Sequence, residues 1–200
     1  MSSDNININI TIGNFFYTSL PLLKKNNSTI DKTSLKYIIK CEMTQSECVR
    51  LGILIEKHFL NFILTMSESL KDIRPPKNKK GNRDMDHLFI DENNKIIHYA
   101  ELKGNVNLDT EKSESTFDKV LLFEKQLKIQ YPEYTINAFL VSVRYPFLED
   151  IPIFVKNKYK GLNLIGGVEY FETFGVSIDT DDYFHFLNQI FFQEFKKTKN

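Results

Sequence analysis

The sequence predicts a mixed α/β domain in which helices flank a central sheet. Three observations predict this fold class: helical spacing of apolar residues over 45–68, two adjacent strand-like runs over 86–90 and 95–103, and an apolar run at 136–143 that follows a second helical segment. The order of helix, hairpin, helix and buried strand is typical of mixed α/β architecture.

Length and composition indicate one domain of ordinary globular type. The chain has 200 residues, of which 42% are hydrophobic and 26% are charged, so a disordered or collagen-like chain is excluded. We expect an N-terminal extension over 1–43, a core over 44–143, and a final region over 144–200 that ends in a helix.

Charge and cysteine content limit the partners and the compartment. Lys plus Arg equals Asp plus Glu at 26 each, so nothing attracts the whole chain to a polyanion, and a nucleic-acid partner needs local basic clusters. The apolar stretches are too short for a membrane-spanning helix, and the first residues lack a signal-peptide pattern. Cys41 and Cys48 are too few for a disulfide framework. We therefore expect a cytoplasmic protein with no membrane partner.

The first long helix is predicted over 45–68. Thr44-Gln-Ser-Glu47 has the spacing of a capping box. Apolar residues then recur at intervals of three and four: Cys48, Leu51, Ile55, Phe59, Phe62, Ile63 and Met66. In the extension before this helix, strand-like alternation is seen at Ile6, Ile8, Ile10 and Ile12.

A hairpin and several further elements follow. Asn93 and Asn94 tolerate positive φ and predict a tight turn between the two strands of the hairpin. The later elements are expected in this order: a helix from Ser115 to Pro132, a strand covered on both faces over 136–143, an irregular segment over 144–178, and a last helix over 179–197.

Glu101-Leu-Lys103 is the most informative chemical pattern. The same spacing occurs in Glu194-Phe-Lys196, but residues two apart on a helix point about 200° from each other, so that second pair diverges. On a strand the period is two, so Glu101 and Lys103 share one face of the hairpin while Leu102 faces the core.

The turn of the hairpin predicts that Asp86 lies opposite Glu101. A two-residue turn at 93–94 and a four-residue turn over 92–95 give the same register, and counting back along both strands brings the two carboxylates together. Directly opposed side chains have Cβ atoms roughly 4.5–5.5 Å apart. The two acids would therefore crowd together beside a lysine.

Two carboxylates at that separation favour a cation between them. Asp86 and Glu101, with the backbone carbonyl of Leu102, make an incomplete oxygen shell of the kind that Mg²⁺ prefers. Lys103 would orient an attacking water or offset charge in the transition state. The alternative is an exposed hairpin whose charged residues form solvated cross-strand pairs.

A third acid is expected near this site. Gly52 and Glu56 lie four residues apart on the inward-tending face of the first predicted helix, beside Phe59 and Ile63. A carboxylate buried there must be paired, protonated or close to a metal, because burying a free charge costs too much. The alternative is a glutamate that reaches solvent at the edge of the apolar stripe.

Residues 74–83 carry five basic residues and no acidic one, and their Pro and Gly content predicts a loop. The alternative is a solvated loop without a ligand. The candidate DNA-binding residues are Lys77, Lys79, Lys80 and Arg83 from this loop, and Arg144 from the later irregular segment.

Taken together, these residues resemble the PD-(D/E)XK nuclease superfamily over roughly 45–143. The matching features are a helix with Gly-x-x-x-Glu, an Asp that opens a hairpin, Glu-Leu-Lys on its second strand, and a following helix and buried strand. The resemblance implies a PD-(D/E)XK nuclease-like core in which Asp86 and Glu101 bind Mg²⁺, or Mn²⁺ as a substitute. It also implies that Lys103 is the catalytic lysine and Glu56 an auxiliary acid.

The sequence departs from the superfamily pattern in three places. The superfamily core usually has another strand between the first helix and the Asp-bearing strand, and residues 67–83 offer no convincing one. Met85 stands where the motif has Pro, and Asp84 is an alternative ligand to Asp86. Gln126 resembles the polar residue that some members place near the site.

The resemblance implies metal-dependent cleavage of double-stranded DNA. Compact members with additions such as 1–43, 74–83 and 144–178 are often type II restriction endonucleases, so we expect a homodimeric, sequence-specific enzyme with a catalytic core over 44–143 and a recognition and dimerisation region over 144–200. A companion DNA methyltransferase acting on the same site is a further expected partner. The alternatives are a structure-directed nuclease, such as a resolvase or repair enzyme, and a non-catalytic DNA-binding module.

Overall fold

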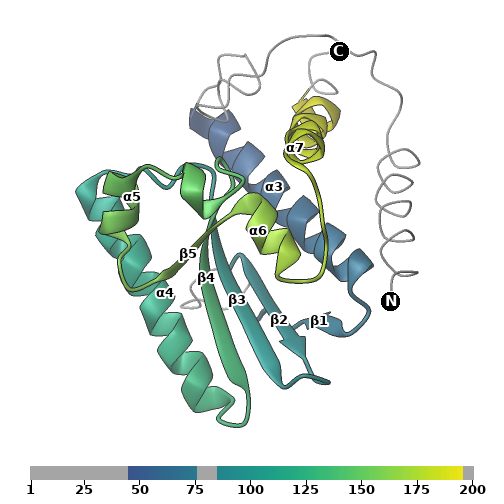
Figure 1. The fold of residues 1–200 in the computed structure, drawn as a ribbon, viewed down its shortest axis with the longest axis vertical. Coiled ribbons are helices and arrows are strands. Elements are labelled where there is room, and N and C mark those ends of the chain that lie inside the picture. Colours follow the sequence, from purple (N-terminus) through teal and green to yellow (C-terminus); the bar gives the residue numbers. More distant parts are fainter. Residues whose placement is uncertain (1–44, 76–84, 196–200) are drawn as a thin grey trace.

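A five-stranded mixed sheet lies between two layers of helices in the computed structural model, which describes residues 45–75 and 85–195 (Figure 1). The strands are β1 (Leu70–Asp72), β2 (His87–Asp91), β3 (Ile96–Lys103), β4 (Thr135–Ser142) and β5 (Asn163–Gly166), and they neighbour one another in this order. Strands β1 to β3 form an antiparallel meander, whereas β4 runs parallel to both β3 and β5. The predicted class, a mixed sheet flanked by helices, is confirmed.

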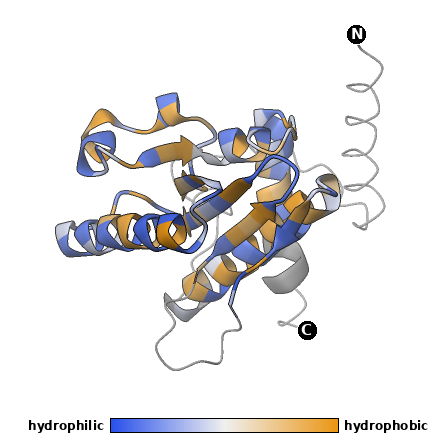
Figure 2. Ribbon diagram, turned by 90° about the horizontal axis from the view of Figure 1, so that it is seen from below, coloured by the Kyte–Doolittle hydropathy of each residue, from blue (hydrophilic) through white to orange (hydrophobic). Residues whose placement is uncertain are grey.

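Each face of the sheet has its own helices. One face packs against α3 (Gln45–Met66), α6 (Gly167–Glu172) and α7 (Thr180–Phe195), and the other against α4 (Thr110–Gln130) and α5 (Ile153–Lys158). Figure 2 shows that hydrophobic residues concentrate on the strands while the helices alternate hydrophobic and hydrophilic residues. Within the described ranges, no helix is both long enough and apolar enough to cross a membrane.

Aromatic side chains fill the core between the sheet and the helices α3, α6 and α7. The ring of Phe59 lies 4.7 Å from that of Phe171 and 5.7 Å from that of Phe186, measured between centroids. The three rings come from three different helices, so their contacts fix the helices to one another as well as to the sheet.

The hairpin forms in the predicted register. His87 pairs with Ala100 and Asp91 with Ile96, so one further step along both strands places Asp86 opposite Glu101. The connection is the four-residue turn, and its residue with positive φ is Lys95, at 56°, rather than either asparagine. Alternation along β3 also follows the prediction, because Leu102 is buried in the core on the face opposite Glu101.

The first and last helices and the central strand are confirmed as well. Helix α3 covers the predicted span, β4 is buried on both faces through Leu140 and Val141, and α7 follows Asp179. The strand-like alternation in 1–43, the Thr44 cap and the end of the last helix lie outside the described residues.

Three expectations were wrong. Residues 67–83 do contain a strand, β1, which the sequence hides because it is three residues long and has only one apolar side chain, Leu70. Helix α4 begins at Thr110 with Asp109 as its cap, well before Ser115, because its first turns carry no apolar residue. The segment expected to be irregular contains α5, β5, α6 and the 3₁₀ turn Leu148–Asp150, all too short for periodicity to reveal.

Two glycines give a matched test of this packing. A Cβ at Gly167 would lie 1.8 Å from the hydroxyl of Tyr183, which donates a 2.7 Å hydrogen bond to the Val143 carbonyl. A Cβ at Gly52, inside α3, would meet nothing within 4 Å. We expect Gly167→Ala to lower the free energy of unfolding by about 2–4 kcal/mol and Gly52→Ala to raise it by about 0.5–1 kcal/mol. Urea denaturation measures both, and equal effects of the two changes would contradict this packing.

Candidate active site

The carboxylate of Glu101 lies at the centre of the candidate site and is almost completely buried. It sits near the C-terminal end of β3, where its side chain is 2% exposed. Lys103 Nζ lies 2.8 Å from one carboxylate oxygen, Oε1, and Lys119 Nζ lies 2.5 Å from the other, Oε2. The Tyr99 hydroxyl, on the same face of β3, is 3.4 Å from Oε2. Such a buried carboxylate is tolerated because ammonium groups pair with it.

Asp86 lies one residue before β2 and faces the same strand end. Its Oδ2 accepts a 2.8 Å hydrogen bond from the backbone N–H of Leu102. Burial and the negative charge of Glu101 raise the pKa of Asp86 to about 6, although Lys119, the Leu102 hydrogen bond and Lys103 act in the opposite direction. The two carboxylates are therefore close enough for the charge of one to oppose ionisation of the other.

Arg74 holds the backbone of Asp86 in place. Its Nη1 donates a 2.9 Å hydrogen bond to the Asp86 carbonyl, and the guanidinium also forms a two-pronged ion pair with Asp72 at the end of β1. The first basic residue of the predicted DNA-binding run thus serves the scaffold of the site, through the strand that sequence analysis missed.

His87 fixes the residue that follows Asp86. The imidazole Nε2 lies 2.8 Å from the Glu56 carbonyl, and Nδ1 lies 2.9 Å from the Tyr170 hydroxyl. A carbonyl oxygen only accepts, so Nε2 carries the proton and Nδ1 accepts from the tyrosine. Burial lowers the pKa of His87 to about 4, and the ring is neutral at pH 7.

Lys103 and Glu56 belong to the same electrostatic group. Burial lowers the pKa of Lys103, but the charge and hydrogen bond of Glu101, together with the charges of Asp86 and Glu56, raise it further than burial lowers it. Glu56 itself is only half-buried on α3. The structure therefore brings the predicted residues Asp86, Glu101 and Lys103 to one end of the hairpin, and Glu56 acts on Lys103 through its charge.

The donor atoms at this strand end fit a hard divalent cation. Asp86 and Glu101 supply carboxylate oxygens, and the carbonyl of Leu102 leaves β3 on the same edge as its N–H, which faces Asp86. Burial, and then the charge of Glu101, raise the pKa of Asp86, and a bound cation would oppose both effects by stabilising the ionised carboxylate. In residues 45–75 and 85–195, no group of three or more His, Cys, Asp or Glu side chains could hold a metal ion. A cation here would therefore depend on two carboxylates, a carbonyl and water.

The other predicted residues are not brought into this group. Gln126 is exposed, and it lies seven residues beyond Lys119, about 10 Å along α4. Arg144 is half-buried after β4, where its guanidinium lies 5.0 Å from the Tyr145 ring centroid and its buried Nε has no hydrogen-bond partner. Four other candidates, and the alternative ligand, lie outside the described residues: Lys77, Lys79, Lys80, Arg83 and Asp84.

Lys119 is the residue of this group that sequence analysis missed. It comes from α4, which crosses the face of the sheet that carries Glu101. Lys119 stands three residues after buried Thr116 and directly before buried Val120, so it borders the inward stripe of the helix. A lysine at that position, on the helix that follows the Glu-Leu-Lys strand, is the signal that could have revealed it.

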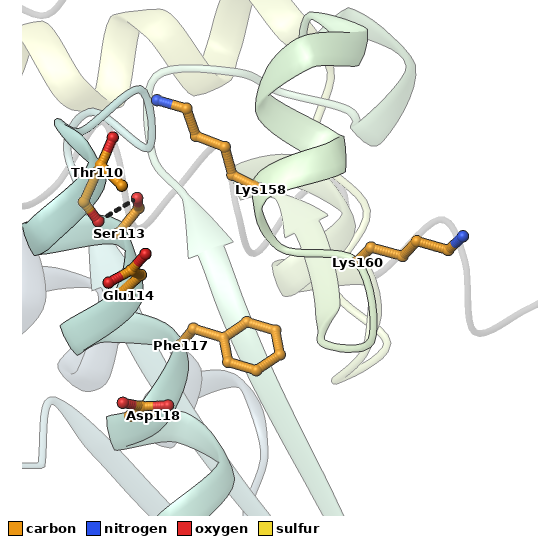
Figure 3. Close-up of a pocket in the computed structure, with 7 residues that line it drawn as sticks. All are labelled: Thr110, Ser113, Glu114, Phe117, Asp118, Lys158 and Lys160. Atoms are coloured by element: carbon orange, nitrogen blue, oxygen red, sulfur yellow. Dashed lines mark hydrogen bonds between the residues drawn. The ribbon is translucent and has the colours of Figure 1, made fainter.

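A separate cavity of about 470 Å³ lies beside α4, lined by residues of that helix and by Lys158 and Lys160 (Figure 3). Figure 3 shows Lys158 reaching towards Thr110 and Ser113 while Lys160 points away from the cavity. Lys158 donates a 2.6 Å hydrogen bond to the Leu108 carbonyl, so its ammonium group is bound to the backbone of the protein itself. The cavity is lined by none of the residues Asp86, Glu101, Lys103 and Glu56.

The pH dependence of stability tests the electrostatics of the metal-free site. The raised pKa of Asp86 means that this group lowers stability as the pH rises from about 4 to 6, whereas the lowered pKa of His87 means that this group lowers stability as the pH falls from about 6.5 to 4. The two effects oppose each other in the native protein. Asp86→Asn removes only the first, so the variant should lose about 1–3 kcal/mol more than the native protein between pH 6 and pH 4.

Urea unfolding in the presence of a chelator, at several pH values, measures this difference. Asp118→Asn, at an exposed position of α4, is the matched control and should follow the native curve. Parallel curves for Asp86→Asn and the native protein would show that Asp86 titrates as an ordinary carboxylate.

Comparison of the chain with protein-family models, with curated protein sequences and with solved structures finds no match in any of the three.

Proposed function

We propose that this protein is a metal-dependent endonuclease that hydrolyses phosphodiester bonds in double-stranded DNA, built on a PD-(D/E)XK nuclease-like core. The observation that carries the proposal is the convergence of Asp86, Glu101 and Lys103 at one end of the β2–β3 hairpin. Two carboxylates that oppose each other's ionisation, beside a lysine, are suited to bind a divalent cation against a phosphate.

The order of elements supports the same proposal. Helix α3, the antiparallel strands β1 to β3, helix α4 and the parallel strand β4 follow one another as the superfamily resemblance leads us to expect. Strand β1 occupies the position between the first helix and the Asp-bearing strand. The departure of residues 67–83 from the superfamily pattern therefore does not count against the proposal.

The residues of the site have distinct roles in this proposal. Asp86, Glu101 and the Leu102 carbonyl would hold Mg²⁺ or Mn²⁺. When bound, such a cation lowers the pKa of a water molecule and offsets charge on the phosphate. Lys103 stays protonated, because its partners raise its pKa, so it suits a role in stabilising the charge of the transition state rather than in removing a proton. Glu56 adds negative charge on the α3 side of Lys103.

Recognition of DNA and assembly complete the proposal. A duplex has two antiparallel strands, and a two-fold symmetric homodimer places one site on each. Because 144–200 adds elements beyond the hairpin, α4 and β4, we propose this region for sequence recognition and dimerisation, in the manner of a type II restriction endonuclease. Such an enzyme needs protection of the host DNA, for which a companion methyltransferase of the same specificity is the expected partner.

Digestion of a mapped plasmid or viral DNA in Mg²⁺, and separately in Mn²⁺, tests the proposed activity. We expect discrete bands from linear duplex, and Lys103→Met should lower the rate at least about 100-fold by removing the charge beside the scissile phosphate. Lys71→Met is the matched control because it removes an exposed lysine that pairs with Glu92 at the surface, and it should cut normally.

Two other results would each favour one of the alternative functions over the proposed one. Cleavage confined to branched DNA would indicate a structure-directed nuclease. DNA binding that needs no metal, is unchanged in Asp86→Ala and is never followed by cleavage would indicate a non-catalytic module.

A further inference from the structure

Glu101 forms ion pairs with two ammonium groups, although one is enough to neutralise its single charge. Lys103 Nζ pairs with Oε1 and Lys119 Nζ with Oε2, so both oxygens of one carboxylate are in contact with lysines. One well-placed ammonium is enough to neutralise a buried carboxylate. The second lysine therefore needs an explanation beyond the burial of Glu101.

The position of Lys119 points to the cation site. Its side chain is 21% exposed, so Lys119 lies at the edge of the buried site and is partly in contact with solvent. Its ammonium contacts Oε2 of Glu101, one of the two carboxylates proposed as metal ligands. An ammonium group at that place occupies a coordination position that a divalent cation bound to Glu101 would use.

We propose that Lys119 is a positioning residue for the cation: it holds the Glu101 carboxylate in the metal-free protein and releases Oε2 when a divalent cation binds. This inference rests on the proposed function, because it assigns a role to Lys119 only if Asp86 and Glu101 bind a metal. It does not follow from the Glu-Leu-Lys pattern, because Lys119 belongs to a different element, α4.

The net charge of the cation-loaded site supports this role for Lys119. Asp86, Glu101 and Glu56 carry three negative charges when ionised, whereas the two lysines and a divalent cation carry four positive charges. The loaded site thus keeps one net positive charge, which complements the single negative charge of a phosphodiester. The ammonium of Lys119, once released from Glu101, is a suitable partner for a non-bridging phosphate oxygen.

Titration of the purified protein with Mn²⁺ in the absence of DNA tests the inference directly. Free Mn²⁺ is measured by electron paramagnetic resonance. Lys119→Met removes the competing charge and keeps much of the side-chain volume, so we expect it to bind Mn²⁺ roughly 5–30-fold more tightly than the native protein. At saturating Mn²⁺, the same variant should cut DNA more slowly, because the phosphate loses a partner.

Two control variants make the result specific. Lys128→Met removes a lysine from the exposed side of the same helix, where it pairs with Glu124, and should leave the affinity for Mn²⁺ unchanged. Lys119→Arg keeps the charge and should retain the native affinity. Lys119→Gln repeats the neutral substitution if thermal melting shows that Lys119→Met does not fold.

The outcomes separate this inference from the proposed function. If the native protein binds no Mn²⁺, or if Asp86→Asn does not abolish the binding, the proposed function fails and the inference fails with it. If the native protein binds Mn²⁺ but Lys119→Met binds it with equal or lower affinity, only the inference is overturned, because Lys119 then merely supports Glu101.

Discussion

Burial of the Glu101 carboxylate is the constraint on which the rest of the site depends. A carboxylate removed from water is tolerated only with compensating positive charge, and two lysines from separate elements provide it. Strand β3, which carries Glu101, is paired on both edges, with β2 and with β4. The acid is therefore carried by a strand that is held from both sides, and α4 must lie across that face for Lys119 to reach it.

Asp86 depends on a different set of contacts, most of which involve its backbone or the residue that follows it. The hairpin register brings it opposite Glu101, Arg74 binds its carbonyl, and His87 anchors the next residue between α3 and α6. Its side chain accepts a hydrogen bond from the Leu102 N–H. The scaffold thus fixes the backbone position from which the Asp86 carboxylate extends.

Local rules of sequence predicted the half of the site that lies within the hairpin. Period-two alternation and the length of the turn were sufficient to place Asp86, Glu101 and Lys103 together, because both are set by residues close in sequence. The partner from α4 was not predicted, because contact between Lys119 and Glu101 depends on how a helix crosses a sheet. Strand β1 was missed for a related reason: three residues with one apolar side chain gain their pairing only once β2 is in place.

Asp86 and His87 are adjacent in sequence but lie on opposite faces of the sheet, which couples the site to the helices on the far face. Alternation sends Asp86 to the face covered by α4 and His87 to the face covered by α3 and α6, where its imidazole bonds to both helices. One peptide bond joins the two residues. A shift of α3 or α6 would therefore move His87 and, through that bond, change the position of Asp86. A ligand that moved α3 or α6 would in this way change the position of the Asp86 carboxylate through the backbone, without contacting the carboxylate itself.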